Sequence, residues 1–296
     1  MDVFITKYIH TRVLMNYYHV DVFSSQSLSG NGLTVIFHEE DLEVQYMQKI
    51  AQEFKQFETI FLQQTGEKRF RVRIFTVEEE LDFAGHPILG AVSTIHNKYY
   101  SNEKKVIVTL ELNNKILQAE SVNMNGYFQA TMNQGIPEFL GTVEGERKQI
   151  FLQALNLSID DIYPQLPIEI ISTGLPYLII PLASGLDKVK ILIRDLEARL
   201  SEVNAKFAYV FDVSKMEGRT WDNFGAVEDV ATGSAAGPVA AYLFKWNICK
   251  ASESIILNQG SFVGRPSKIK VYSEQTTGEI HVSGSVKLIA KGQLLS

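Results

Sequence analysis

The first half of the chain combines short segments in which apolar and polar residues alternate with two longer segments of helical spacing. Residues 18–23 form the first strand-like segment, since every second side chain there is apolar. Further strands are predicted at 33–37, 58–63, 70–75, 106–112, 115–120 and 127–132. Helices are predicted at 42–54 and from 86 to about 100, where Pro87 suits a first helical turn.

The second half repeats this plan. It contains predicted helices at 146–155 and around 191–200, and strand-like segments at 169–172 and 177–181. A glutamate, a glycine and a short polar residue recur at a spacing of 148 positions. They are Glu80, Gly85 and His86 in the first half, and Glu228, Gly233 and Ser234 in the second. An internal match of this kind, in the same strand-rich context, indicates duplication.

The two glycines each precede a helix that is apolar nearly all round, over residues 86–100 and 235–246. Such helices must be surrounded by other elements. The pattern therefore predicts an α+β fold of two similar strand-rich domains related by a pseudo-twofold axis. Each domain is expected to be a β-barrel-like sheet wrapped around one central helix, and the two helix N-termini are expected to meet at a shared cleft.

Residues 1–15 show no comparable pattern and are interpreted as an N-terminal extension, with Met15 as an alternative start. An extra strand at residues 3–5 is the alternative. We place the N-terminal domain at 16–128 and the C-terminal domain at 129–285, with 286–296 as a last strand that is a candidate to return to the N-terminal domain.

The composition restricts the range of possible functions more than it restricts the fold. With 45% hydrophobic and 21% charged residues the chain is an ordinary globular protein. Its formal net charge of −6 provides no positive field for a nucleic acid. The apolar runs are far shorter than the roughly 18 residues that span a bilayer, and no signal-peptide pattern opens the chain. We expect a cytoplasmic protein that binds neither nucleic acid nor membrane.

Cysteine and histidine usage argues against a metal or cofactor. Cys249 is the single cysteine, so an intrachain disulfide, a cysteine zinc cluster and a two-thiol mechanism are all excluded. We interpret it as a packing residue at the end of the second apolar helix. The six histidines show no metal-ligand spacing, and Gly30-x-Gly32 lacks the third glycine that dinucleotide binding needs. We therefore expect neither metal nor cofactor.

The two helix starts are candidate anion sites. A helix N-terminus presents unpaired N–H groups and the positive end of the helix dipole, so Gly85 and Gly233 could hold a carboxylate or an enolate-like charge. The alternative is that these glycines only allow close helix packing. His86 and Ser234 occupy the two starts, and Asp229 precedes the second one.

Glu58 is the candidate acid/base. It lies among Phe54, Phe57 and Phe61, which could desolvate its carboxyl group, raise its pKa and suit it to proton transfer near neutrality. The local pattern alone favours a solvated strand glutamate instead. A serine nucleophile at Ser234 fails the G-x-S-x-G spacing, because Thr232 stands where glycine is required.

Together these segments resemble the phenazine biosynthesis-like (PhzF) family of isomerases, which share the fold of diaminopimelate epimerase. The similarity extends from about Tyr18 to Leu294. It rests on an ordered set of motifs: 75–90 around Gly85-His86-Pro87, 172–176 (Ser-Thr-Gly-Leu-Pro), 228–238 around Thr232-Gly233-Ser234, Gln259-Gly260, and 264–267 (Gly-Arg-Pro-Ser).

This resemblance implies a set of roles and a mode of catalysis. Glu58 would be the acid/base, which reverses its local interpretation. His86, Asp229 and Ser234 would shuttle protons and orient substrate, and Gly85 and Gly233 would supply backbone amides. The related epimerases carry cysteines at the two helix starts, which are His86 and Ser234 here.

Phe57, Gly32 and Val230 depart from the family pattern without removing a candidate catalytic group. Phe57 stands where serine is usual, which puts in doubt that the substrate is that of the phenazine enzyme.

The leading hypothesis is a cofactor-independent, homodimeric isomerase in which Glu58 moves a proton within a small carboxylate-bearing metabolite. A ligand-binding protein of the same fold without turnover is the first alternative. A serine hydrolase built on Ser234, His86 and Asp229 is the second. The sequence does not select the substrate.

Overall fold

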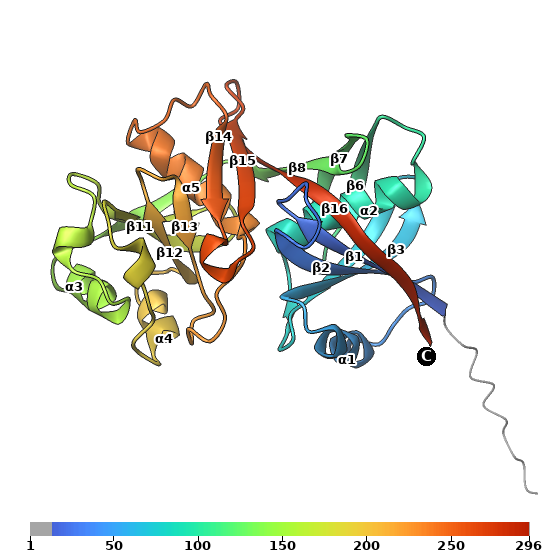
Figure 1. Cartoon of the computed structure of the whole chain (residues 1–296), viewed down its shortest axis with the longest axis horizontal. Helices are drawn as coiled ribbons and strands as arrows, with labels where there is room; N and C mark the ends of the chain where they lie inside the picture. The colour runs from blue at the N-terminus through green and yellow to red at the C-terminus, as the bar shows by residue number, and fades with distance from the viewer. Residues whose placement is uncertain (1–13, 296) are drawn as a thin grey trace, which may run out of the picture.

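A computed structural model describes residues 14–295 as two lobes that lie side by side (Figure 1). The N-terminal lobe contains β1 (Leu14–Val22), β2 (Asn31–Phe37), α1 (Val44–Phe54), β3 (Glu58–Gly66), β4 (Arg69–Phe75), β5 (Glu80–Leu81), α2 (Gly85–Tyr99), β6 (Lys105–Glu111), β7 (Ile116–Asn123) and β8 (Phe128–Gly135). The C-terminal lobe contains β9 (Glu138–Val143), α3 (Gly145–Ala154), β10 (Ile168–Ser172), β11 (Pro176–Leu182), α4 (Leu196–Ser201), β12 (Phe207–Asp212), β13 (Glu217–Arg219), α5 (Gly233–Lys245), β14 (Ile255–Gln259) and β15 (Ser267–Ser273). The last strand, β16 (Ile280–Leu295), is shared by both lobes.

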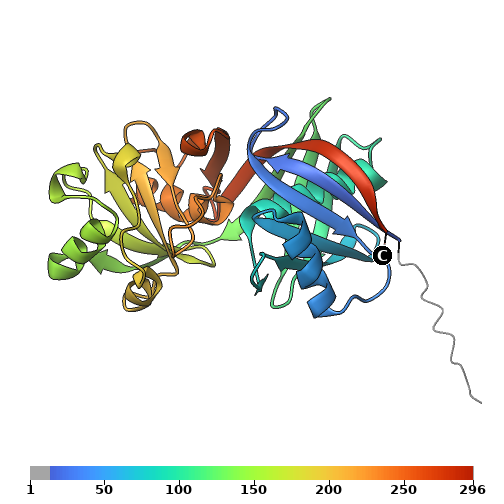
Figure 2. The ribbon, with the colours of Figure 1, turned by 60° about the horizontal axis from the view of Figure 1, so that its bottom comes forward.

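The N-terminal lobe is a sheet closed on itself. Its strand order is β1-β2-β3-β4-β6-β7-β8-β16, and β16 returns to pair with β1 along its whole length, from Val22 opposite Val286 to Leu14 opposite Leu295. Helix α2 lies inside this barrel (Figure 2), with Ile88, Leu89 and Val92 fully buried. Closure leaves these strands no free edge and surrounds the apolar helix on all sides.

The C-terminal lobe continues the same sheet from β16 in the order β15-β14-β13-β12-β11-β10-β9. These strands cover α5, in which Val239, Ala240 and Leu243 are fully buried. The side chains of α2 and α5 belong to one continuous apolar core that spans both lobes. The predicted α+β architecture of two strand-rich units around central helices is confirmed.

The N-termini of α2 and α5 touch each other. A Cβ atom added at Gly85 would lie 2.8 Å from both the carbonyl carbon of Gly233 and the backbone nitrogen of Ser234. Real Cβ atoms do not approach other atoms so closely, so glycine is required here by contact and not by backbone conformation. The two helix starts therefore form one junction between the lobes.

Several element predictions need correction. β1 begins at Leu14, so Leu14 and Met15 belong to a strand and not to the expected extension of residues 1–15. An extra strand at residues 3–5 lies outside the described residues. The helix expected over 191–200 is the short α4, because residues 189–195 run irregularly before it.

The two lobes exchange chain segments more than the expected boundaries suggest. β8 crosses the expected boundary between residues 128 and 129, and β16 crosses the one between 285 and 286. Cys249 lies beyond the end of α5 and is half-buried, packed against the main core. Within residues 14–295, no helix is both long and apolar enough to cross a bilayer.

The contact between the helix starts can be tested with Gly85→Ala. The added methyl group must push the two starts apart, so we expect the free energy of unfolding to fall by about 1–3 kcal/mol, as for other overpacked sites. Gly66→Ala is the matched control, because the nearest atom to a Cβ there is the Arg69 Cβ at 3.6 Å, an ordinary contact. Its effect should stay within about 0.5 kcal/mol. Equal effects of the two substitutions in urea unfolding would contradict the close contact.

Candidate active site

Polar side chains from both lobes converge on the junction of the two helix starts, and all but the half-buried Ser234 are buried. Asn31 opens β2, Glu58 opens β3 and His86 is the second residue of α2, whereas Asp229 and Ser234 flank the start of α5. Strands β2 and β3 are parallel neighbours, with Leu33 opposite Glu58, so both strands begin at the same end of the barrel.

Glu58 faces the inside of the barrel. Its strand alternates, so Glu58, Ile60 and Leu62 point toward α2, and only 7% of Glu58 is exposed. The expected apolar wall of phenylalanines is wrong in part, because Phe61 packs on the outer face against α1, and Phe54 is itself the last residue of that helix. Burial of Glu58 comes from the barrel interior.

The carboxyl group of Glu58 lies against the imidazole of His86. Their Oε2 and Nε2 atoms are 3.2 Å apart, and the His86 side chain is 4% exposed. Neither atom makes a well-aligned hydrogen bond, although both are fully buried. Buried polar groups are almost always paired, so an unpaired couple indicates a place where a further group binds.

Burial controls the protonation of this couple. Loss of water around Glu58 raises its pKa well above the usual value, and the nearby Asp229 carboxyl raises it further. Burial lowers the pKa of His86 to about 3, which keeps its imidazole neutral at ordinary pH. Of the two groups, the carboxyl group of Glu58 therefore takes up an added proton before the imidazole of His86 does.

Asn31 connects the two lobes across the junction. Its Nδ2 donates to Asp229 Oδ1 at 2.9 Å and to the Ala231 carbonyl at 3.0 Å, and it lies 3.4 Å from His86 Nδ1. An amide nitrogen cannot accept a hydrogen bond, so a hydrogen on His86 Nδ1 would point at the Asn31 amide group; the contact therefore favours the tautomer with its hydrogen on Nε2, the atom that faces Glu58.

The turn that carries Asn31 is fixed from the other lobe. Arg265 donates through Nε to the Gly30 carbonyl at 2.7 Å and through its terminal nitrogen to Asp21 at 2.7 Å. Gly30 has a φ of +77°, and a Cβ there would lie 2.4 Å from the Val22 carbonyl. Both Gly30 and Arg265 are thus required to place Asn31.

Asp229 is held by several donors. Its carboxylate accepts from Asn31, from the Thr232 hydroxyl and from the Ala231 N–H. Burial raises its pKa although these bonds oppose the shift. Gln259 fixes the same loop, since its Nε2 donates to the Asp229 carbonyl at 2.9 Å and its Oε1 accepts from the Thr232 N–H at 3.1 Å.

Ser234 is turned toward Tyr177. The two hydroxyl oxygens are 2.7 Å apart, and burial raises the pKa of Tyr177, which therefore stays neutral. Among the described residues, Tyr177 is the hydrogen-bond partner of the Ser234 hydroxyl, so His86 and Asp229 do not activate it. This geometry suits an orienting hydroxyl better than a nucleophile.

The repeat seen in the sequence has a structural explanation. In the hairpin before α2, Arg73 forms a two-pronged ion pair with Glu80. Before α5, Arg219 binds Glu228 in the same way, at 2.8 and 2.6 Å. The repeated glutamates therefore hold the hairpins that precede the helices, and they stand outside the polar network of the junction.

The six predicted site residues thus meet at one place. The prediction did not include Asn31, Tyr177, Gln134 or Gln259. In the sequence Asn31 appeared only as the residue between Gly30 and Gly32, and Gln134 donates to the Gly233 carbonyl at 2.9 Å from β8, far away in sequence. Nothing local in the sequence marks such long-range partners.

Two other features bear on the position of the site. Within residues 14–295, no three His, Cys, Asp or Glu side chains are arranged to hold a metal ion.

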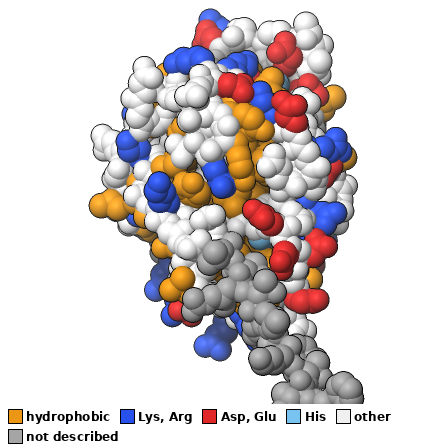
Figure 3. Space-filling model, turned by 90° about the vertical axis from the view of Figure 1, so that its right-hand side faces the viewer, with side chains coloured by type: hydrophobic (Ala, Val, Ile, Leu, Met, Phe, Trp, Pro, Cys, Tyr) orange, Lys and Arg blue, Asp and Glu red, His pale blue; other side chains and the backbone are white. Residues whose placement is uncertain are grey.

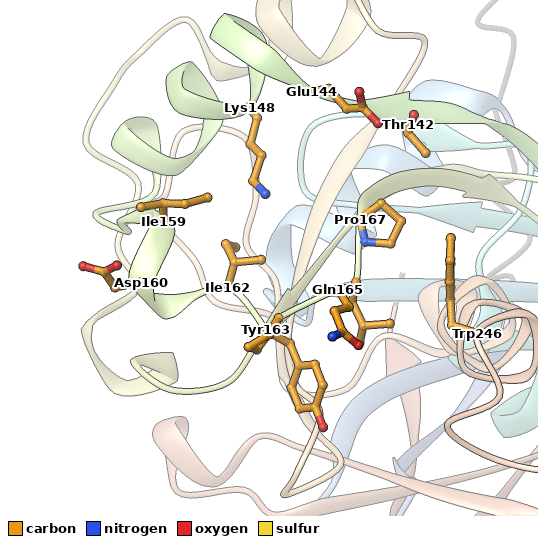
Figure 4. A pocket seen from close by; sticks show the side chains of 12 residues that line it. Thr142, Glu144, Lys148, Ile159, Asp160, Ile162, Tyr163, Gln165, Pro167 and Trp246 are labelled. Atoms are coloured by element: carbon orange, nitrogen blue, oxygen red, sulfur yellow. The ribbon is translucent and has the colours of Figure 1, made fainter.

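A hollow of about 720 Å³ lies in the C-terminal lobe, lined by residues of 142–167 and by Trp246 (Figure 4). Its acidic side chains, Glu144 and Asp160, are exposed, and none of the predicted site residues lines it. The buried network at the junction is the better candidate for catalysis.

Comparison with known proteins identifies the family of the chain. The model of the phenazine biosynthesis-like protein family (PhzC-PhzF) matches residues 20–292. The chain is 32% identical over 291 residues to trans-2,3-dihydro-3-hydroxyanthranilate isomerase of Pseudomonas fluorescens, covering 95% of this chain and 99% of the relative. It is 31% identical over 275 residues to an uncharacterized isomerase of Escherichia coli K12, covering 86% and 88%.

Solved structures show the same fold. A predicted epimerase from Pseudomonas aeruginosa superimposes with a TM-score of 0.89 at 43% identity, covering 95% of this chain and 99% of that one. A hydroxyproline epimerase from Agrobacterium vitis reaches a TM-score of 0.62 at 10% identity, covering 95% and 92%, which shows a shared fold. The relatives and the solved structures thus define an isomerase with the diaminopimelate epimerase-like fold. The chain belongs to the phenazine biosynthesis-like family.

The raised pKa of Glu58 predicts how stability depends on pH. A carboxyl group whose pKa is higher in the folded state stabilises the fold fully below its unfolded pKa of about 4.3, and this contribution is lost as pH rises through the folded pKa. Each unit of elevation corresponds to about 1.4 kcal/mol. Compared with Glu58→Gln, the parent should therefore lose unfolding free energy as pH rises above about 4.3. A difference between the two proteins that is constant with pH, measured by urea unfolding, would be incompatible with the raised pKa.

Proposed function

We propose that this isomerase moves a proton within a small carboxylate-bearing metabolite, with Glu58 as the acid/base and without a cofactor or metal. The observation that carries the proposal is the buried couple of Glu58 Oε2 and His86 Nε2, which are 3.2 Å apart and make no well-aligned hydrogen bond. Perturbed titratable groups without partners are typical of functional sites.

The proton transfer has two steps. As a carboxylate, Glu58 takes a proton from an acidified carbon, and the electron pair of the broken C–H bond moves into the adjacent unsaturated system of the substrate. As a carboxylic acid, Glu58 then returns that proton to another carbon of the same molecule. A raised pKa makes the carboxylate a stronger base, and the same group serves in both directions.

The remaining residues stabilise and orient. The negative charge that develops on the substrate would lie before the N-termini of α2 and α5, where backbone N–H groups near Gly85 and Gly233 can donate to it. Neutral His86, held by Asn31, presents its Nε2 hydrogen to the reacting region. Asp229 fixes Asn31, and Ser234 with Tyr177 would orient the substrate.

The proposal extends to a substrate class and no further. The P. fluorescens relative is named for trans-2,3-dihydro-3-hydroxyanthranilate, an unsaturated ring acid. Phe57 stands where the family has serine, so for this chain we propose a carboxylate-bearing substrate of the same general kind. A ligand-binding protein without turnover would share the site, and it is separated from the isomerase by the exchange experiment below.

The expected homodimer and cytoplasmic location stay predictions. Figure 3 shows hydrophobic side chains gathered at the end of the molecule formed by the N-terminal lobe, with charged side chains around them. A second copy of the chain could pack on such a face.

Glu58→Gln should abolish proton exchange while sparing ligand binding. Gln keeps the shape of the side chain but cannot take or return a proton, and loss of a positioned acid/base group lowers rates by about 10²–10⁴-fold. The measurement is solvent-deuterium incorporation into trans-2,3-dihydro-3-hydroxyanthranilate and into an untargeted metabolite extract. Ser234→Ala is the matched comparison and should retain more exchange, because that hydroxyl orients and does not attack. Parental exchange in Glu58→Gln would exclude Glu58 as the acid/base.

A further inference from the structure

Lys115 is a cation at the edge of the helix-start junction. It lies in the turn between β6 and β7, where the Leu112 N–H donates to the Lys115 carbonyl at 2.9 Å. Asn113, two residues before Lys115, donates from its side-chain amide to Glu80 at 2.8 Å. The turn is therefore tied to the Arg73–Glu80 pair that precedes α2, and the start of the Lys115 side chain is fixed.

The ammonium group of Lys115 lies between the two lobes. Its Nζ is 3.4 Å from the centre of the Phe83 ring, and Phe83 is two residues before Gly85 at the start of α2. On the other side, a Cβ added at Gly174 would lie 3.9 Å from the same Nζ. Gly174 belongs to the 172–176 loop of the C-terminal lobe.

That loop packs on the first turns of α5. The hydroxyl of Thr173 donates to Gln134 Oε1 at 3.1 Å, and Gln134 Nε2 donates to the Gly233 carbonyl at 2.9 Å. Lys115 Nζ is thus placed between the residues that lead into α2 and the loop that covers α5. Phe83 precedes the start of α2 by two residues, and Gly174 is next to Thr173, so the position of Nζ is at the edge of the helix-start junction.

The charge of Lys115 has no counter-ion. Among residues 14–295, no carboxylate lies within 4.0 Å of its Nζ. Lys115 is exposed as a whole residue, but its ammonium group lies against the Phe83 ring, and partial loss of water lowers the pKa of Lys115. A partly desolvated cation without a counter-ion attracts an anion more strongly than a fully solvated lysine does.

We propose that Lys115 Nζ binds a carboxylate of the substrate at the edge of the helix-start junction and so determines the preference for acids. The assignment rests on the proposed function, in which the helix starts stabilise the charge that develops at the reacting carbon. Lys115 binds the permanent negative charge of the substrate carboxylate. The helix N-termini stabilise the negative charge that develops during proton transfer. Together they favour an unsaturated metabolite whose carboxylate lies to one side of the carbon that loses its proton.

Benzoate and its neutral analogue benzamide provide the test, because they differ in charge and little in shape. Calorimetric titration of the full chain should show tighter binding of benzoate. Lys115→Met should weaken benzoate binding by roughly 10-fold to 100-fold, the range for a charge-assisted hydrogen bond, and leave benzamide binding unchanged. Lys115→Arg should retain most of the benzoate affinity. Lys49→Met is the matched control, since it removes one exposed positive charge from α1 on the outer face of the sheet.

Two results would overturn the assignment of Lys115. The first is parental benzoate affinity in Lys115→Met. The second is a parent protein that binds benzoate no better than benzamide, including one that binds neither. Glu58→Gln should bind benzoate like the parent. A failure of the isomerase proposal therefore shows as missing deuterium exchange with the benzoate preference intact, whereas a failure at Lys115 shows in the benzoate titrations alone.

Discussion

The direct contact between the N-termini of α2 and α5 is the constraint on which the rest of the structure depends. A Cβ atom at Gly85 would lie 2.8 Å from backbone atoms of Gly233 and Ser234, so neither start can move toward the other and no side chain fits between them. Each helix is apolar nearly all round and needs a sheet around it. Two sheet-wrapped helices that meet end to end place two positive dipole ends at one point, which becomes the natural place for negative charge.

Burial determines the acid–base properties of the groups at the helix-start junction. Glu58 and His86 are shielded by the barrel, which raises the pKa of the carboxyl group and lowers that of the imidazole. The surrounding hydrogen bonds do not neutralise the couple; Asn31 holds the far side of the imidazole and leaves Nε2 toward Glu58. A fully paired Glu58 would be more stable and less reactive, so the unpaired atoms indicate that stability has been given up for function.

Much of this arrangement could be predicted from the sequence, and the reasons are local. The two helices and their glycine starts were visible because their apolar residues are contiguous, and the motifs of 75–90 and 228–238 indicated the family. The burial of Glu58 could not be predicted from its neighbours, because it depends on which face of β3 turns toward α2. The flanking Phe54 and Phe61 suggested a wall that lies on the other side of the strand.

The features that could not be predicted all depend on long-range pairing. The sequence suggested that the last strand returns to the N-terminal domain but not that it pairs with β1, and Asn31, Gln134 and Arg265 reach their partners in the other lobe. Sequence periodicity reports only on neighbours along the chain, so it gives the strands and not their partners. Polar residues that fix a site from a distance therefore become visible only in the structure.

The most direct measurement of the central claim is the ionisation of Glu58 itself. Carbon-13 NMR of the ligand-free protein, labelled at glutamate side-chain carboxyl carbons and assigned with Glu58→Gln, follows this group as the pH changes. The account predicts a midpoint well above the ordinary value of about 4.3, with the proton retained on Glu58 while exposed glutamates have lost theirs. A midpoint at or below that value would contradict the account, because a solvated or fully paired carboxylate could not serve as the acid/base of this site.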